Sequence, residues 1–152
     1  MLRELQVTMN KPANAMAKSN HDEKMKTGTA VLMSANGDSF APPEEDENRR
    51  DLFFVDKERI PTGMNVIRTD VSDYDEDFTT IAPGEFAKLI AYHAGERFAT
   101  DQFVEEGLEP GVNVGANSEG KLIAFDGRTK YVFKGFMNDA GHKLAIIQVV
   151  DC

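Results

Sequence analysis

The chain has 152 residues, of which 41% are hydrophobic and 28% charged, and its formal net charge is −9 at pH 7. This length fits one domain that buries roughly two-thirds of the surface its unfolded chain would expose. The acidic balance argues against general nucleic-acid binding, which needs a basic surface. No apolar run approaches the roughly 18 residues that a membrane helix requires, and no signal-peptide core is visible, so we expect synthesis in the cytoplasm.

Residues 1–27 differ in composition from the rest of the chain. They carry five Lys or Arg against three Asp or Glu, a net charge of +2, whereas residues 28–152 carry a net charge of −11. Five of the seven methionines lie within the first 33 positions. Methionine adapts well to irregular apolar grooves, so we predict that residues 1–27 form an extended N-terminal arm held by another subunit. A disordered tail is the alternative.

The arm offers a small set of apolar side chains as anchors for a partner. An extended segment gives much contact area per residue, and a strand added to a neighbour's sheet would satisfy its backbone groups. We therefore predict that the arm binds a partner or sister subunit through five residues: Leu2, Leu5, Val7, Met9 and Met16.

Residues 28–152 carry short apolar runs separated by turn signals, which predict an all-β domain. Turns at intervals of about ten residues are typical of a small β-sandwich or β-barrel. The last run, Leu144–Val150, is too apolar for a surface edge, so we place it centrally in a sheet. The predicted strands are Ala30–Ala35 before the hairpin dipeptide Asn36-Gly37, Leu52–Val55, Met64–Ile67, 111–115, 121–125, Tyr131–Met137 and Leu144–Val150.

Residues 83–95 are ambiguous between helix and strand. Phe86, Leu89, Ile90 and His93 would share one helical face, whereas alternating positions from Phe86 also fit a strand. Two similar phrases, Pro-Gly-Glu-Phe-Ala and Ala-Gly-Glu-Arg-Phe-Ala, follow one another at a spacing that favours a strand. Two polar stretches, 42–51 and 70–80, are predicted to be surface loops, and solvation is a more common role for such loops than partner binding.

The motifs that normally carry chemistry are incomplete in this chain. Residues 115–121 fit the start of a phosphate loop, but Leu122 stands where Mg²⁺ binding needs Ser or Thr, and a hairpin turn explains the glycines better. The acidic run from Asp70 lacks the glycine and glutamate of a calcium-binding EF-hand loop. The three histidines are far apart, and Cys152 ends the chain. We therefore expect no enzyme, no cofactor and no metal.

Three phrases in the second half of the chain resemble a known family. Ala94–Phe103, Leu108–Val112 and Ser118–Leu122 are similar in order and rhythm to segments of capsid decoration proteins of tailed bacteriophages, which are also called head-stabilising or cement proteins. The resemblance covers about half of the chain and consists of turn-and-strand phrases. It implies a β-rich domain on the outer capsid face, often a trimer, with an N-terminal arm that lies across neighbouring subunits.

The expected function is therefore structural. The chain would bind the major capsid protein, and sister copies of itself, on the outer surface of a virion and stabilise the shell by bridging neighbouring subunits. It would bind neither nucleic acid nor membrane. The first alternative is a non-enzymatic β-sandwich module for carbohydrate or surface adhesion, although the chain has no Trp and only three Tyr for stacking on sugars. The second alternative is a small β-barrel enzyme.

Overall fold

The computed structural model describes residues 1–6, 13–46, 52–57 and 79–150. The predicted all-β fold is confirmed, because the described residues form β-strands joined by turns and loops. The strands are β1 (Leu2–Gln6), β2 (Ala13–Ser19), β3 (Met25–Lys26), β4 (Ala30–Met33), β5 (Ser39–Ala41), β6 (Phe53–Asp56), β7 (Thr80–Ile81), β8 (Phe86–Ala91), β9 (Arg97–Thr100), β10 (Asn113–Ala116), β11 (Leu122–Ala124), β12 (Tyr131–Asp139) and β13 (His142–Val149).

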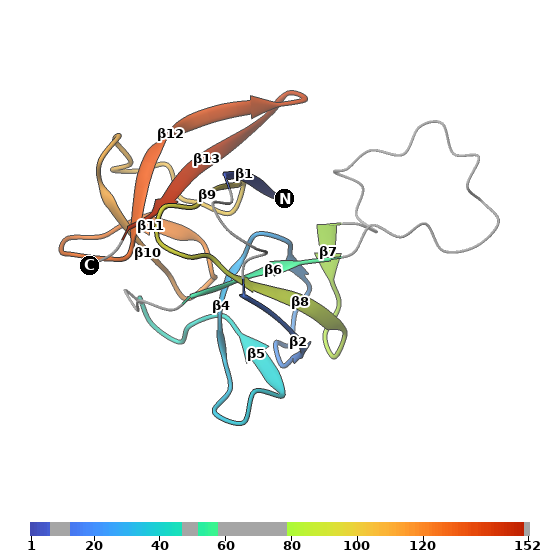
Figure 1. Cartoon of the computed structure of the whole chain (residues 1–152). Coiled ribbons are helices and arrows are strands. Elements are labelled where there is room, and N and C mark those ends of the chain that lie inside the picture. The colour runs from blue at the N-terminus through green and yellow to red at the C-terminus, as the bar shows by residue number, and fades with distance from the viewer. Residues whose placement is uncertain (7–12, 47–51, 58–78, 151–152) are drawn as a thin grey trace.

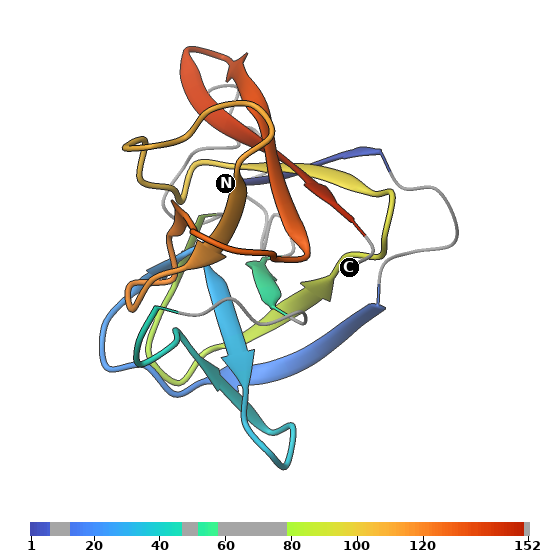
Figure 2. The same cartoon turned by 90° about the vertical axis from the view of Figure 1, so that its left-hand side faces the viewer.

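The strands form an antiparallel sheet and a closed barrel, which Figures 1 and 2 show packed against each other. The sheet has six strands in the order β1-β9-β13-β12-β10-β11. The barrel has five strands in the order β2-β5-β4-β6-β8, in which β2 and β5 run parallel and the other neighbours antiparallel. The short strands β3 and β7 form a separate pair.

One apolar core joins the barrel to the sheet. The ring of Phe54, from β6 of the barrel, lies 4.5 Å from that of Phe98, from β9 of the sheet. Tyr92 stacks on Phe98 with ring centroids 4.4 Å apart. The Tyr131 hydroxyl accepts a hydrogen bond from the backbone N–H of Leu52 at 3.0 Å and donates one to its carbonyl at 3.2 Å. Because these contacts cross between the two parts, they form one cooperative unit.

The predicted boundary at residue 28 differs from the structure. Strands β1 and β2 lie before it, yet β1 pairs with β9 and β2 pairs with both β5 and β8. Leu2 belongs to the core shared with Phe98, and Met25 and Ala17 belong to the core of the barrel. The described parts of residues 1–27 are thus strands of the body rather than an arm beside it, because backbone pairing and apolar burial are both available within the chain.

The strands predicted in the body are mostly confirmed. Elements β4, β6, β10, β11, β12 and β13 overlap the predicted runs, and β13 is central because it pairs with both β9 and β12. Residues 83–95 contain a strand, β8, as the alternation indicated. The run Met64–Ile67 lies outside the described residues, as do most of the loop 70–80 and Cys152. The sequence did not predict β5, β7 or β9.

The two Gly-Glu phrases form the same turn twice, and each turn leads into a strand. The backbone N–H of Glu85 donates to the carbonyl of Ala82 at 3.0 Å, and that of Glu96 donates to His93 at 3.1 Å. In each turn the glutamate Oε2 also accepts a hydrogen bond from the N–H of the first turn residue: Ala82 donates to Glu85 at 2.9 Å, and His93 donates to Glu96 at 3.0 Å. The third turn residue is a glycine with positive φ, 77° at Gly84 and 91° at Gly95, as type II turns require. These turns explain the similarity of the two phrases.

The hairpin between β12 and β13 contains a strained alanine, which gives a first prediction. Ala140 has φ of 52° and is followed by Gly141 with φ of 88°, so both central residues have the positive φ of a type I′ turn. Asn adopts this conformation more readily than Ala. We expect Ala140→Asn to stabilise the protein by about 0.5–1 kcal/mol in urea unfolding. The matched variant Ala140→Val should lose stability; a loss for both variants would contradict the turn assignment.

Candidate binding surface

The five predicted anchor residues occupy different environments. Leu2 is buried, with 5% of its surface exposed, so a partner cannot contact it unless β1 leaves the sheet. This burial contradicts the role predicted for Leu2, and it follows from pairing of β1 with β9. Leu5, in contrast, is 42% exposed. Val7 and Met9 lie outside the described residues, and Met16 is described only as a backbone position of β2.

The α-amino group of Met1 is held inside the protein. It donates to the carbonyl of Thr27 at 2.7 Å and to Oδ1 of Asp101 at 2.6 Å. Burial lowers the pKa of this amine below its usual value of 8.0, although Asp101 opposes the shift. The contact connects the start of β1 to the end of β9 and to the β3–β4 turn, so it fixes the first strand against the body.

Loss of the Asp101 carboxylate should destabilise the protein in a pH-dependent way. Asp101→Asn removes the charge that compensates the buried amine and should cost about 1–3 kcal/mol near pH 6. An amine whose folded-state pKa is lowered binds fewer protons when folded, so stability rises with pH up to about 8. The loss should therefore be smaller at pH 9, where the amine is neutral. Urea unfolding at both pH values tests this, with the exposed Asp22→Asn as control. An equal loss at both would exclude the amine as the partner.

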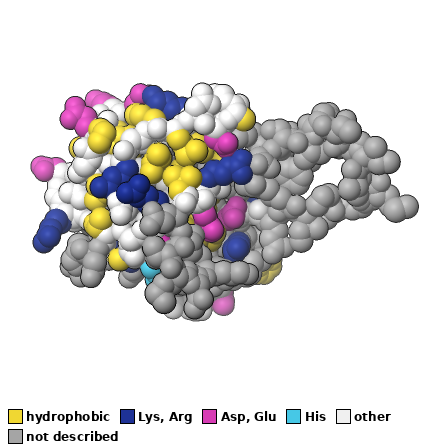
Figure 3. Space-filling view, turned by 45° about the horizontal axis from the view of Figure 1, so that its top comes forward, with side chains coloured by type: hydrophobic (Ala, Val, Ile, Leu, Met, Phe, Trp, Pro, Cys, Tyr) yellow, Lys and Arg dark blue, Asp and Glu magenta, His cyan; other side chains and the backbone are white. Residues whose placement is uncertain are grey.

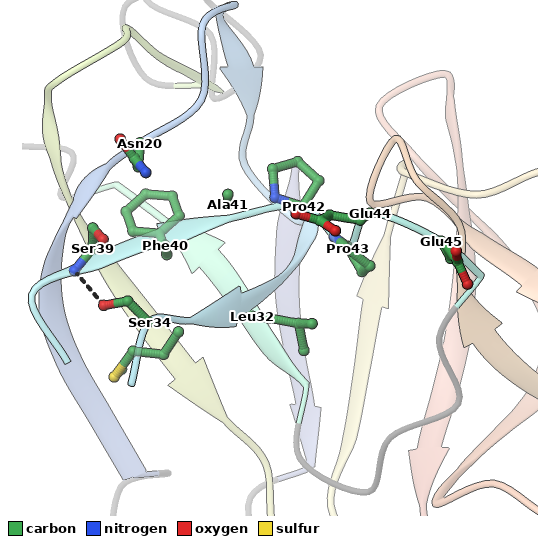
Figure 4. A pocket seen from close by; sticks show the side chains of 11 residues that line it. Asn20, Leu32, Ser34, Ser39, Phe40, Ala41, Pro42, Pro43, Glu44 and Glu45 are labelled. Carbon is green, nitrogen blue, oxygen red and sulfur yellow. Dashed lines mark hydrogen bonds between the residues drawn. The ribbon is translucent and has the colours of Figure 1, made fainter. Parts of the chain in front are cut away.

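The surface hollow with the clearest chemical character lies on the barrel, and we call it the Phe40 groove. Its volume is about 410 Å³, which falls in the range of ligand pockets. Figure 4 shows Ser34 and Ser39 near one end, Phe40 and Leu32 between, and Glu44 and Glu45 at the other end. The lining residues are Asn20, Leu32, Met33, Ser34, Ser39, Phe40, Ala41, Pro42, Pro43, Glu44 and Glu45.

The local sequence explains the shape of the Phe40 groove. Strands β4 and β5 form a hairpin whose tip contains Asn36-Gly37, and the backbone N–H of Gly37 donates to Ser34 at 3.0 Å. Phe40 is buried beside Met33 in the barrel core, whereas Leu32 and Ala41, which pair across the hairpin, form the apolar floor of the groove. The Pro42-Pro43 pair then ends β5, because proline has no N–H to continue the ladder. The chain therefore leaves the barrel at the point where the two glutamates begin.

Pro42 also lines a second hollow. Its volume is about 540 Å³, and its charges are mixed rather than of one sign. Lys121 and Glu119 in its wall are 3.5 Å apart. The charged residues lining it are Glu23, Lys24, Lys26, Asp101, Glu119 and Lys121, with His21 beside them.

Two aromatic side chains of the described surface are unusually exposed. Phe86, at the start of β8, is 62% exposed, and Phe136, on the long β12–β13 hairpin, is 36% exposed. Phe136 packs against Phe103 with ring centroids 5.5 Å apart, and the Lys143 ammonium lies 4.0 Å from its ring centre. Lys143 also pairs with Glu105 at 2.5 Å. The side chains around Phe136 therefore hold it in place at the surface.

The top of the molecule also carries apolar side chains. Figure 3 shows hydrophobic side chains gathered on this face with Lys and Arg beside them. In strands β12 and β13, Met137 and Ile146 are partly buried against Leu144. Arg3 of β1 forms an ion pair with Asp139 of β12 at 2.9 Å, so the positive charge of Arg3 is compensated within the chain.

The described residues contain no group of three His, Cys, Asp or Glu side chains placed to hold a metal ion. Among them, two buried polar atoms lack a hydrogen-bond partner, the hydroxyl of Tyr92 and Oε1 of Glu96. Burial raises the pKa of Tyr92 above its usual value. Three carboxylates raise it further: Glu4, Asp56 and Glu96. Tyr92 is therefore a neutral core residue.

The residues that resembled a phosphate loop form a turn before a strand. The Asn117 side chain accepts hydrogen bonds from the backbone N–H groups of Glu119 and Lys121, both at 3.0 Å. Strand β11 begins at Leu122. This geometry supports the hairpin explanation of the glycines over the phosphate loop.

Most residues that line the Phe40 groove were not predicted from the sequence. The sequence marked 42–51 as an acidic loop, which includes Glu44 and Glu45, but gave no signal that this loop borders β5. The available signal was the Pro42-Pro43 pair directly after Phe40, since it predicts that a strand ends there. The link to Asn20 could not be predicted, because it depends on the parallel pairing of β2 with β5.

Comparison with protein families gives no match for this sequence, and comparison with curated proteins gives none either. No helix in the described part of the chain is long and apolar enough to cross a membrane. The fold and surface described above therefore carry the functional argument, together with the three phrases that resemble capsid decoration proteins.

Proposed function

We propose that this chain is a structural virion protein that binds the outer surface of a phage capsid and stabilises it by bridging neighbouring subunits. The observation that carries the proposal is the resemblance of three phrases, within 94–122, to decoration proteins. These phrases include β9 and the turn before β11. Bridging requires contact area spread over a stable body, and a barrel and sheet with one shared core supply such a body.

The exposed apolar side chains of the body also support the proposal. Leu5, Phe86 and Phe136 are large, apolar and at least 36% exposed. Of these, Phe86 and Phe136 belong to the aromatic type that is enriched at the cores of protein interfaces. Leu5 stays in the proposal as a partner-binding residue, whereas Leu2 does not, because it is buried.

The proposal is tested by mass spectrometry of purified particles from the source. We expect the protein to be present in a fixed ratio to the major shell protein, since a bridging subunit occupies equivalent positions on the shell. Particles treated to remove loosely attached proteins serve as the control. Absence from washed particles would contradict the proposal.

A non-enzymatic binding module is the second candidate, and the second hollow favours it. That hollow is polar, has a volume of about 540 Å³ and includes one aromatic side chain, Phe103. Carbohydrate sites combine polar side chains with an aromatic surface. A glycan array would test this candidate; binding that is lost in Phe103→Ala, with an unchanged fold, would favour it.

A further inference from the structure

We propose that the Phe40 groove binds an extended polypeptide segment that carries an apolar side chain and, a few residues further on, Lys or Arg. Within the function proposed above, on which this inference rests, the segment belongs to the major shell protein. The proposal thus names the contact face of the protein and the chemistry of the chain that occupies it.

The arrangement of the groove favours an elongated occupant. Its hydroxyl groups, its apolar floor and its carboxylates follow one another along the chain from Ser39 to Glu45, as Figure 4 shows. This stretch spans at most about 20 Å, because an extended chain advances at most 3.3–3.6 Å per residue. A peptide of about six residues is therefore the longest that the groove covers from end to end.

The middle of the groove is suited to an apolar side chain. Leu32 and Ala41 pair across the hairpin and are partly exposed there, and Leu32 packs against the core shared by the barrel and the sheet. A side chain placed over these two residues would contact a surface that is already fixed by the β4–β5 hairpin. Burial of such a side chain is favourable, and a fixed groove loses little entropy on binding.

The end of the groove defines the charge of the occupant. Glu44 and Glu45 are exposed, and they are the charged residues among its lining. Within the described part of the chain, neither forms an ion pair. Glu105, which is also exposed, is paired with Lys143. Two adjacent carboxylates that have no ion pair among the described residues, beside an apolar floor, complement Lys or Arg, which would also speed association at low salt.

The polar end places a weaker requirement on the occupant. The Ser34 hydroxyl donates to Oδ1 of Asn36 at 2.7 Å and accepts from the backbone N–H of Ser39 at 3.2 Å. These groups are already satisfied within the hairpin, so they contribute shape more than new hydrogen bonds. Selectivity is therefore expected to come from the apolar floor and the two carboxylates.

Two synthetic octapeptides test the proposal on the full chain. They share a central leucine and differ only in carrying two lysines or two glutamates after it. Titration followed by ¹⁵N NMR should show the lysine peptide shifting resonances of Leu32, Phe40 and Glu44, and the glutamate peptide binding at least tenfold more weakly. Binding of both peptides to equal extents, or shifts confined to other surfaces, would overturn the proposal.

Charge variants provide the matched comparison. E44K/E45K should weaken binding of the lysine peptide at least tenfold, whereas E106K/E109K, which changes the same charge at two other exposed positions, should alter it less than twofold. If E44K/E45K does not give a folded spectrum, E44Q/E45Q takes its place. If E44K/E45K and E106K/E109K bind the lysine peptide equally well, the carboxylates of Glu44 and Glu45 have no role in binding.

Binding to purified particles separates this inference from the proposed function. If the natural chain sediments with particles and E44K/E45K does so equally well, the function stands and the groove is not its contact face. If the natural chain does not bind particles, the capsid function fails, and with it the shell protein as the source of the segment. The peptide titration then decides alone whether the groove takes a basic peptide.

Discussion

A chain that begins at Lys26 is expected not to fold. It lacks β1 and β2, and β2 closes the barrel by pairing with β8 over six residue pairs and with β5 over two. It also lacks three buried side chains, Met1, Leu2 and Met25, each worth about 1.5–3 kcal/mol. These losses together approach the whole stability of a typical domain, about 5–15 kcal/mol. Far-UV circular dichroism and the dispersion of an NMR spectrum measure the outcome.

Point variants in β1 serve as the control for this deletion. Leu2→Ala should cost about 2–4 kcal/mol, because it leaves a cavity in the shared core. Leu5→Ala should change stability by less than about 0.5 kcal/mol, because the side chain is already 42% exposed. A shortened chain that unfolds cooperatively, together with equal effects of the two variants, would show that residues 1–25 are an independent arm after all.

The second large effect is expected at Gly120, in the turn before β11. Its φ is 75°, and a Cβ there would lie 2.7 Å from the carbonyl oxygen of Ala30 and would also clash with the Thr29 side chain. The carbonyl of Gly120 accepts a hydrogen bond from the N–H of Ala30 at 2.8 Å, which explains the close approach. We expect Gly120→Ala to cost about 3 kcal/mol, roughly 1 kcal/mol of it from the positive φ. Thermal unfolding should shift down by about 6–12 °C.

Gly111 provides the matched control for Gly120. Its φ is 98°, but a Cβ there would meet nothing within 4 Å. Gly111→Ala should therefore cost only about 1 kcal/mol, from backbone strain alone. Similar losses for the two variants would mean that the contact between the turn and β4 does not contribute to stability.

The candidate site was less predictable than the fold, for a physical reason. The sequence marked the acidic residues at 42–51 from composition alone, and Glu44 and Glu45 proved to border a groove. It could not place Leu32 and Asn20 beside them, because that arrangement depends on pairings between β5 and two other strands. The anchor prediction was wrong at Leu2 for another reason. An apolar side chain fits a partner's groove and the protein's own core equally well, so the sequence could not distinguish the two.

By itself, the sequence determined the all-β class, the turns at Asn36-Gly37 and at 118–120 and the central place of Leu144–Val150, whereas it left 83–95 open between helix and strand. These features depend on alternating side chains and on glycine conformation, which are local properties. Only the tertiary structure decided that β1 and β2 pair with strands of the body. Whether a short apolar strand pairs with its own chain or with another depends on which edge is open to it, and here the edges of β9 and β8 are available. The same long-range pairing closes the barrel, buries the Met1 amine against Asp101 and forms the Phe40 groove.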